Sequence, residues 1–184
     1  MQDYADRGLA VLWIEPIPEI FRILCDRISR FANQSAVQAL VTDETGKDCS
    51  FHISSNNGES SSIYEPAQVT DIWPQLGFGR TISLTSITLP ELLETNRINI
   101  RRFDCLVLDT QGSELLVLKG AERILRQFKF IKTEAADFEA YAGCGRLEEI
   151  CSYLEGLGFA EVERRQLASH PDGGAYFDVV FQRD

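Results

Sequence analysis

Four short apolar runs, separated by segments of helical periodicity, constrain the fold of this chain more than any other feature of its sequence. Each run ends at an acidic residue: Leu9–Ile14 at Glu15, Ala36–Thr42 at Asp43, Phe103–Leu108 at Asp109, and Phe128–Thr133 at Glu134. The first and third runs are almost continuous in valine, leucine and isoleucine, which is typical of strands buried on both faces of a parallel sheet. We therefore predict a strand at each of the four runs.

Three stretches repeat apolar residues at helical spacing, one after Pro18, one after Gly112 and one from Leu147 to Leu157. Alternating strands and helices predict an α/β fold with a twisted, mostly parallel sheet and right-handed crossovers. At the C-terminus, residues 159–167 and 175–182 flank a Pro-Asp-Gly-Gly turn, which predicts an antiparallel hairpin.

Two regions depart from this alternation. Residues 49–54 alternate apolar and polar side chains, which predicts a half-exposed strand. Residues 56–80 begin with a polar stretch and show little periodicity, so we expect an inserted loop or lid. The aromatic residues of this segment either line a pocket or hold the loop against the domain, and the second interpretation is preferred; they are Tyr64, Trp73 and Phe78.

Composition narrows the possible partners and the compartment. The 184 residues predict a single domain spanning 1–184. A net charge of −10, from 18 basic and 28 acidic residues, argues against nucleic-acid binding. No apolar run approaches the ~20 residues that a membrane span needs, so no membrane partner is expected. The five cysteines are odd in number and scattered, which favours a reducing, cytoplasmic location and argues against a disulfide framework or a zinc site, and no metal-binding residues are predicted.

The four acidic residues that end the apolar runs are candidates for a shared site. Ligands of open α/β sheets bind beyond the carboxyl ends of the strands, where all four would emerge. The alternative is that each is a turn former or helix cap. For any single residue the two interpretations are equally tenable, and for the set the shared site is favoured.

The stretch Leu108-Asp-Thr-Gln-Gly-Ser-Glu-Leu-Leu-Val-Leu-Lys-Gly-Ala121 is the most specific in the chain. Together with Trp13-Ile-Glu-Pro-Ile-Pro-Glu19 and Lys132-Thr-Glu-Ala135, it resembles the FkbM-type methyltransferases. The resemblance extends from about Tyr4 to Phe181. It implies a Rossmann-like class I methyltransferase fold and transfer of a methyl group from S-adenosyl-L-methionine, usually to a hydroxyl.

The resemblance also implies roles for individual residues. Glu15, with the adjacent Pro16, matches the position that holds the ribose hydroxyls of the cofactor. Asp43 is similar in place to the acidic turn near the adenine. Asp109 matches the position beside the methyl group and the acceptor, and Glu134 matches the acid that closes the same pocket. The acceptor is then expected to be a small molecule, such as a sugar or glycan.

The chemistry of methyl transfer requires a group that takes the acceptor's proton. Asp109 is the preferred candidate and Glu134 the second, with the alternative that Asp109 only caps the following helix. His52 and His170 are expected on the surface. Four polar loop residues either bind the acceptor or form a solvated turn; they are Asn56, Asn57, Ser60 and Ser61.

The sequence departs from the family pattern at its start. The family places a strand, a glycine-rich turn and a helix before the Glu15 strand, whereas eight residues precede Leu9 here. The expectation is an N-terminally incomplete domain that lacks the first central strand. An alternative function follows, namely a catalytically inactive, truncated methyltransferase-like domain that binds a partner or a sugar. An NAD-type dehydrogenase is disfavoured because no Gly-x-Gly-x-x-Gly follows a strand.

Overall fold

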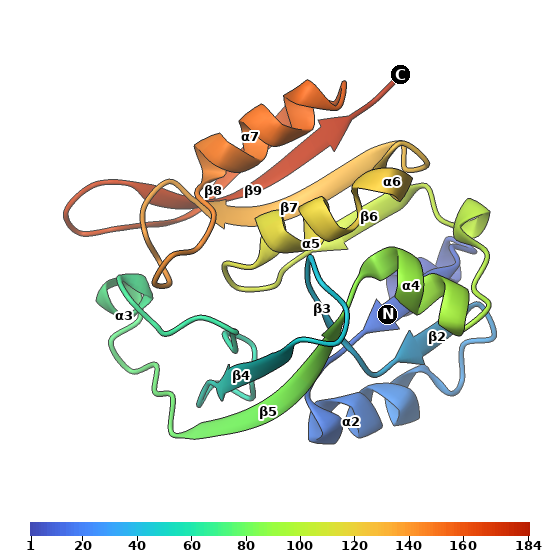
Figure 1. The fold of residues 1–184 in the computed structure, drawn as a ribbon, viewed down its shortest axis with the longest axis horizontal. Helices are drawn as coiled ribbons and strands as arrows, with labels where there is room; N and C mark the ends of the chain where they lie inside the picture. Colours follow the sequence, from blue (N-terminus) through green and yellow to red (C-terminus); the bar gives the residue numbers. More distant parts are fainter.

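The computed structural model describes residues 1–184, and its N-terminal part contains two small sheets (Figure 1). The first pairs β1 (Val11–Ile14) with β2 (Gln34–Val37) in parallel. In the second, β5 (Arg80–Ile87) is parallel to β3 (Leu40–Val41) and antiparallel to β4 (Asp48–Ile53). The predicted half-exposed strand at residues 49–54 is therefore confirmed as β4.

A four-stranded sheet forms the C-terminal part, in the order β6-β7-β9-β8. β6 (Cys105–Leu108) is parallel to β7 (Phe130–Ala136), and β9 (Ala175–Gln182) is antiparallel to β7 and to β8 (Ala160–Ser169). The predicted C-terminal hairpin is confirmed. β8 forms one edge of the sheet and is exposed along most of its length; its charged side chains protect that edge from pairing with other chains.

Helices and turns connect and cover the strands, and α5, α6 and α7 run along the C-terminal sheet (Figure 1). They are α1 (Gln2–Asp6), α2 (Pro18–Ile28), α3 (Val69–Ile72), α4 (Leu89–Thr95), the 3-10 helix η1 (Ile100–Arg102), α5 (Glu114–Gly120), α6 (Glu122–Leu125) and α7 (Leu147–Gly156). The main core lies between these helices and the sheet. Its completely buried members include Leu118, Ile131, Ile150 and Phe181.

The mixed α/β class is confirmed, but the prediction of one mostly parallel sheet is wrong, because the strands form three sheets with three parallel and three antiparallel pairings. Two of the predicted strands also end at different residues. The run 36–42 does not form one strand, because the chain leaves β2 and β3 pairs with β5 in another sheet. The strand predicted at 128–133 is too short at its C-terminal end, because pairing with β9 continues as far as Ala136, opposite Tyr176. Glu134 therefore lies within β7 and does not follow it.

The prediction that the first and third runs are buried on both faces is wrong. All four residues of β1 are half-buried, and Val107 in β6 is 59% exposed. β1 pairs only with β2 and β6 only with β7, so each of these strands has one free edge.

Four elements were not predicted, namely β5, α4 and the short helices α3 and η1, and one predicted helix is divided. β5 alternates Ile82 and Leu84 with polar residues, a signal that was present in the sequence, and α4 follows it. The helix predicted after Gly112 consists of α5 and α6. Ala121 separates them because its backbone, at φ −97° and ψ 0°, leaves the regular helical conformation.

Candidate active site

Three carboxylates meet where β6 and β7 approach α5. Asp109 is the first residue after β6, and Glu114 is the first residue of α5. Leu108 and Thr133 are partners in the parallel register, so Asp109 and Glu134 follow at adjacent positions of neighbouring strands. The sheet thus brings together two of the acidic residues predicted to share a site, and the turn into α5 adds a third.

Glu114 holds the turn that leads from β6 into α5. Its carboxylate accepts hydrogen bonds from the backbone N–H groups of Thr110, at 2.7 Å, and Gly112, at 2.9 Å. Gln111 and Gly112 both have left-handed backbone conformations, with φ of 54° and 99°, so this turn needs such support. The alternative role of Asp109 as helix cap is wrong, since Ser113 is the N-cap of α5, no side chain caps this helix, and the Asp109 carboxylate accepts from the Gln111 side chain instead. Sequence reasoning gave Glu114 no role, although an acid directly after a glycine turn was a usable signal.

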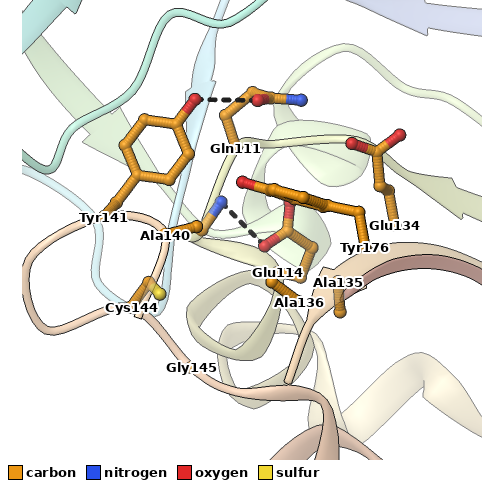
Figure 2. A pocket seen from close by; sticks show the side chains of 11 residues that line it. Gln111, Glu114, Glu134, Ala135, Ala136, Ala140, Tyr141, Cys144, Gly145 and Tyr176 are labelled. Carbon is orange, nitrogen blue, oxygen red and sulfur yellow. Dashed lines mark hydrogen bonds between the residues drawn. The ribbon is translucent and has the colours of Figure 1, made fainter. Parts of the chain in front are cut away.

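Gln111 connects Asp109 to the rest of the site. Its amide nitrogen donates to the Asp109 carboxylate at 2.6 Å. Its amide oxygen accepts from the Tyr141 hydroxyl at 2.8 Å (Figure 2). The same hydroxyl lies 3.0 Å from the carbonyl oxygen of Ser60, and the Ser62 hydroxyl donates to the Gln111 carbonyl at 2.6 Å. These bonds attach the polar loop, residues 54–62, to the turn after β6.

The loop of residues 54–62 is largely hydrogen-bonded to itself. Asn56 bonds the backbone N–H and the hydroxyl of Ser60, and the buried Ser61 accepts from the Ser54 N–H. Asn57 is exposed, with φ of 58°. Three of the four predicted acceptor-binding residues therefore have partners within the loop, and the loop lies beside Gln111 and Tyr141.

Glu15 follows β1, and its carboxylate accepts the backbone N–H of Ile17 at 2.7 Å. Burial raises its pKa, and the bond from Ile17 opposes this effect. Pro16 is half-buried beside it. The polar loop reaches this turn as well, because Gly58 packs against the side chains of Ile17 and Ile20. The loop thus contacts both the Glu15 turn and the Gln111 turn.

Asp43 is not part of the carboxylate cluster. It follows β3 and is exposed, and its backbone lies against Gly120 at the C-terminal end of α5. Glu114 is at the opposite end of that helix, roughly 9 Å along its axis. The separation has a clear cause, because β3 pairs in a different sheet from β6 and β7.

The surface location predicted for the two histidines is wrong for His170. This residue is 6% exposed, its Nε2 lies 3.2 Å from the Asp71 carboxylate, and its ring packs on Phe138. It ties the β8–β9 turn to α3. His52 is half-buried and lies 3.5 Å from Glu65. Neither histidine lines the cavity beside the carboxylates.

The aromatic residues of segment 56–80 pack against a second apolar cluster. Tyr64, Trp73 and Phe78 all contact this cluster, which contains Tyr141 and Tyr176. The Trp73 and Tyr176 rings are 5.3 Å apart. These contacts agree with the preferred interpretation, in which the aromatic residues hold the segment against the domain.

None of the three carboxylates of the cluster forms a salt bridge, although the charge of Lys132 opposes the rise in the pKa of Asp109. Lys132 and Arg165 both pair with Asp178 instead, at 3.0 and 3.4 Å. Burial, followed by the charges of Asp109 and Glu114, raises the pKa of Glu134 to about 7. Burial also raises the pKa of Glu114 to about 7. Asp109 is exposed at the surface, but loss of hydration against the surrounding protein still moves its pKa upward. The site therefore has an unbalanced negative charge that would favour a proton or a cationic ligand.

A small cavity of about 10 Å³ lies beside this cluster (Figure 2). Its volume is about that of one water-sized group. Gln111, Glu114, Glu134, Tyr141 and Tyr176 contribute polar atoms to its lining. It therefore suits a single hydroxyl, and a cofactor would have to lie outside it.

The raised pKa values predict how stability depends on pH. The pKa of Glu134 is about 7 in the folded protein, against an ordinary value of 4.5, so between these pH values the folded protein binds more protons than the unfolded chain. Stability is therefore expected to fall as pH rises from about 4.5 to 7. Glu134→Gln should raise the free energy of unfolding at pH 8 by about 1 kcal/mol, a value reduced for solvent screening of a half-exposed group, and leave it unchanged at pH 4.5. Urea unfolding at both pH values measures this, and equal effects would contradict it.

The family model for the methyltransferase FkbM domain matches residues 1–160, which is most of the chain. The chain belongs to the FkbM methyltransferase family. Membership makes this an S-adenosylmethionine-dependent methyltransferase domain and implies a Rossmann-like fold, as the sequence motifs predicted. Searches of curated proteins and of solved structures found no match. None of the helices in this FkbM domain has the length and apolar character needed to cross a membrane.

The residues of this FkbM domain fit the cofactor that the family typically uses. S-adenosylmethionine carries its reactive methyl group on a positively charged sulfur, and none of the carboxylates Asp109, Glu114 and Glu134 forms a salt bridge. The negative cluster therefore complements the charge of the cofactor. Glu15 also suits a hydroxyl donor, since the structure gives only one of its carboxylate oxygens a hydrogen bond.

Proposed function

We propose that this FkbM domain methylates a hydroxyl group on a small polyhydroxy molecule, such as a sugar or another metabolite. The observation that supports this most is that Asp109 and Glu134, both with raised pKa values, lie at adjacent positions of neighbouring strands, beside a cavity that can admit a further hydroxyl of the same molecule. A hydroxyl must lose its proton during the reaction, and a carboxylate with a raised pKa is a suitable acceptor near neutral pH.

In the proposed mechanism, Asp109 orients the acceptor hydroxyl and takes its proton. Bound S-adenosylmethionine supplies an electrophilic methyl group, so most of the rate enhancement comes from positioning the acceptor. Gln111 fixes the Asp109 carboxylate through the 2.6 Å hydrogen bond, leaving one carboxylate oxygen for the acceptor. Glu134 is the second candidate for the proton, since its pKa of about 7 is also suitable.

Other residues are proposed to hold the cofactor. Glu15 would accept hydrogen bonds from the ribose hydroxyls, with Pro16 fixing the chain beside it. Asp43 would lie near the adenine, and Asp109 would face the sulfonium. The polar loop, with Asn56, Asn57, Ser60 and Ser61, would border the acceptor, because it contacts both the Glu15 and the Gln111 turns.

The reaction class can be tested with methyl-labelled S-adenosylmethionine. The chain is incubated with separate sets of small alcohols and sugars, amines, and thiols, and the labelled products are separated. Label transferred to a hydroxyl oxygen supports the proposal. Transfer only to nitrogen or sulfur acceptors would overturn it.

Glu15→Ala is expected to weaken S-adenosylmethionine binding by about 1.5–3 kcal/mol, the range for a hydrogen bond to a charged group. Calorimetric titration measures the affinity, and thermal melting checks that the fold is retained. The control is Glu19→Ala, which removes an exposed carboxylate paired with Arg80. Glu19 lies near the start of α2, the helix that follows the Glu15 turn. Equal affinities for the Glu15 variant and the unmodified chain would exclude Glu15 from the cofactor site.

A binding domain without methyl transfer is the second candidate function. The free edges of β1 and β6 favour it, because these two strands share no neighbour in this structure. Titration with S-adenosylmethionine and S-adenosylhomocysteine separates the two candidates. Binding of either compound at micromolar concentration favours the enzyme, and sugar binding without cofactor binding favours the second candidate.

A further inference from the structure

Tyr176 has a buried hydroxyl without a partner. The residue is 4% exposed, and its oxygen has no hydrogen bond within the protein. Buried polar groups almost always have a partner, because the lost hydration is otherwise not replaced. A phenylalanine would fill the same space without this cost, so packing alone gives no reason for a tyrosine here.

The structure fixes the ring of Tyr176 firmly and leaves its hydroxyl free. The ring packs at 5.3 Å from that of Trp73 and edge-on to Phe138 at 5.4 Å. Tyr176 is paired with Ala136 at the end of β7, two residues beyond Glu134. The side chain therefore has little freedom to turn its hydroxyl toward another protein group.

The hydroxyl points into the cavity between Gln111 and Glu114 (Figure 2). Gln111 and Glu134 are both half-exposed, so this side of the cavity adjoins the place proposed for the acceptor. A group that enters here meets the phenol and the carboxylates of Glu114 and Glu134. A hydroxyl matches this set, because it can accept from Tyr176 and donate to a carboxylate.

We propose that Tyr176 binds a second hydroxyl of the acceptor, next to the hydroxyl that is methylated. The acceptor is then a compound with adjacent hydroxyl groups, as in a sugar or polyol. This inference rests on the proposed function and adds a selection rule to it. Asp109 acts on one hydroxyl, and the cavity with Tyr176 selects molecules that carry its neighbour.

The test compares the full chain with Tyr176→Phe, which removes only the hydroxyl. The control is Tyr153→Phe, which removes a hydroxyl bonded to Glu122 at 2.8 Å on the surface of α7. The probes are cis-1,2-cyclohexanediol and cyclohexanol, each titrated by ligand-observed NMR with S-adenosylhomocysteine present. The unmodified chain and the control should bind the diol roughly 2- to 12-fold more tightly than the alcohol, as one net hydrogen bond implies. Tyr176→Phe should bind the two equally.

Thermal melting of the same variants provides the second measurement. Without ligand, Tyr176→Phe should melt at the same temperature as the unmodified chain or above it, because no protein bond is lost. A lower melting temperature would show that the hydroxyl serves the fold, through a bound water, and would overturn the proposal. So would an unchanged diol preference in Tyr176→Phe, or no diol preference in the unmodified chain.

Methyl transfer to the same two probes separates this inference from the proposed function. If methyl transfer to the diol and to cyclohexanol is equally efficient and Tyr176→Phe has no effect, the proposed function stands and the second-hydroxyl site is excluded. A diol preference in binding that Tyr176→Phe abolishes, without transfer to any hydroxyl, supports the site and contradicts the proposed reaction.

Discussion

Asp109→Asn is expected to lower turnover by roughly 10²–10⁴-fold, the usual size of a general acid–base contribution. Asparagine has nearly the same shape and can still accept the hydrogen bond from Gln111, so the turn should be preserved. What is lost is the negative charge and the ability to take a proton. Single-turnover measurements at saturating S-adenosylmethionine measure the chemical step, while calorimetry measures cofactor affinity, which should change much less.

Asp104→Asn is the matched control for this prediction. Asp104 precedes β6 and is exposed, so it lies at the other end of the same strand. Its variant should retain normal turnover. If Asp109→Asn also retains near-normal turnover, Asp109 is not the proton acceptor, and Glu134→Gln becomes the variant to measure.

Gly120→Ala is expected to destabilise the domain by about 3 kcal/mol, the upper part of the usual range for overpacking. A Cβ at this position would collide with the carbonyl oxygen of Thr42 and would lie 2.7 Å from the Cα of Asp43. Both are backbone atoms, so no side-chain rotation relieves the contact. Either α5 or the end of β3 must move, and the movement would displace Asp43. Urea unfolding with fluorescence detection measures the loss.

Gly156→Ala provides the control, because Gly156 is also at the C-terminal end of a helix but has open space around it. Alanine favours a helix over glycine by about 1 kcal/mol, so this variant should be slightly more stable than the unmodified chain. Equal destabilisation by the two substitutions would mean that the contact between α5 and β3 does not limit packing at Gly120.

Local patterns in the sequence were sufficient for the elements that carry Asp109 and Glu15. A continuous apolar run followed by an acid, a glycine and a helical repeat predicted β6, its turn and α5, and the motif around it indicated the family. The C-terminal hairpin was equally clear, because alternation on both sides of a Pro-Asp-Gly-Gly turn is a short-range signal. Each of these features is determined by residues within about ten positions of one another.

Glu114 and Glu134 show where such local information ends. The sequence places an acid after the glycine turn, but only the packed structure makes Glu114 2% exposed and directs both of its oxygens to backbone amides. Similarly, the run ending at residue 133 looks complete, yet pairing with β9 extends β7 past Glu134. Partners that are distant in the chain decide both outcomes.

The sequence by itself determined the α/β class, the family and the acidic residues at the ends of β1 and β6, since periodicity and turn chemistry are properties of neighbouring residues. Only the tertiary structure decided that Tyr141 and Tyr176 line the same cavity as Gln111, that His170 is buried, and that the run 36–42 divides between two sheets. These features depend on which faces pack together. That choice is made by long-range burial and pairing, which no local pattern in the chain specifies.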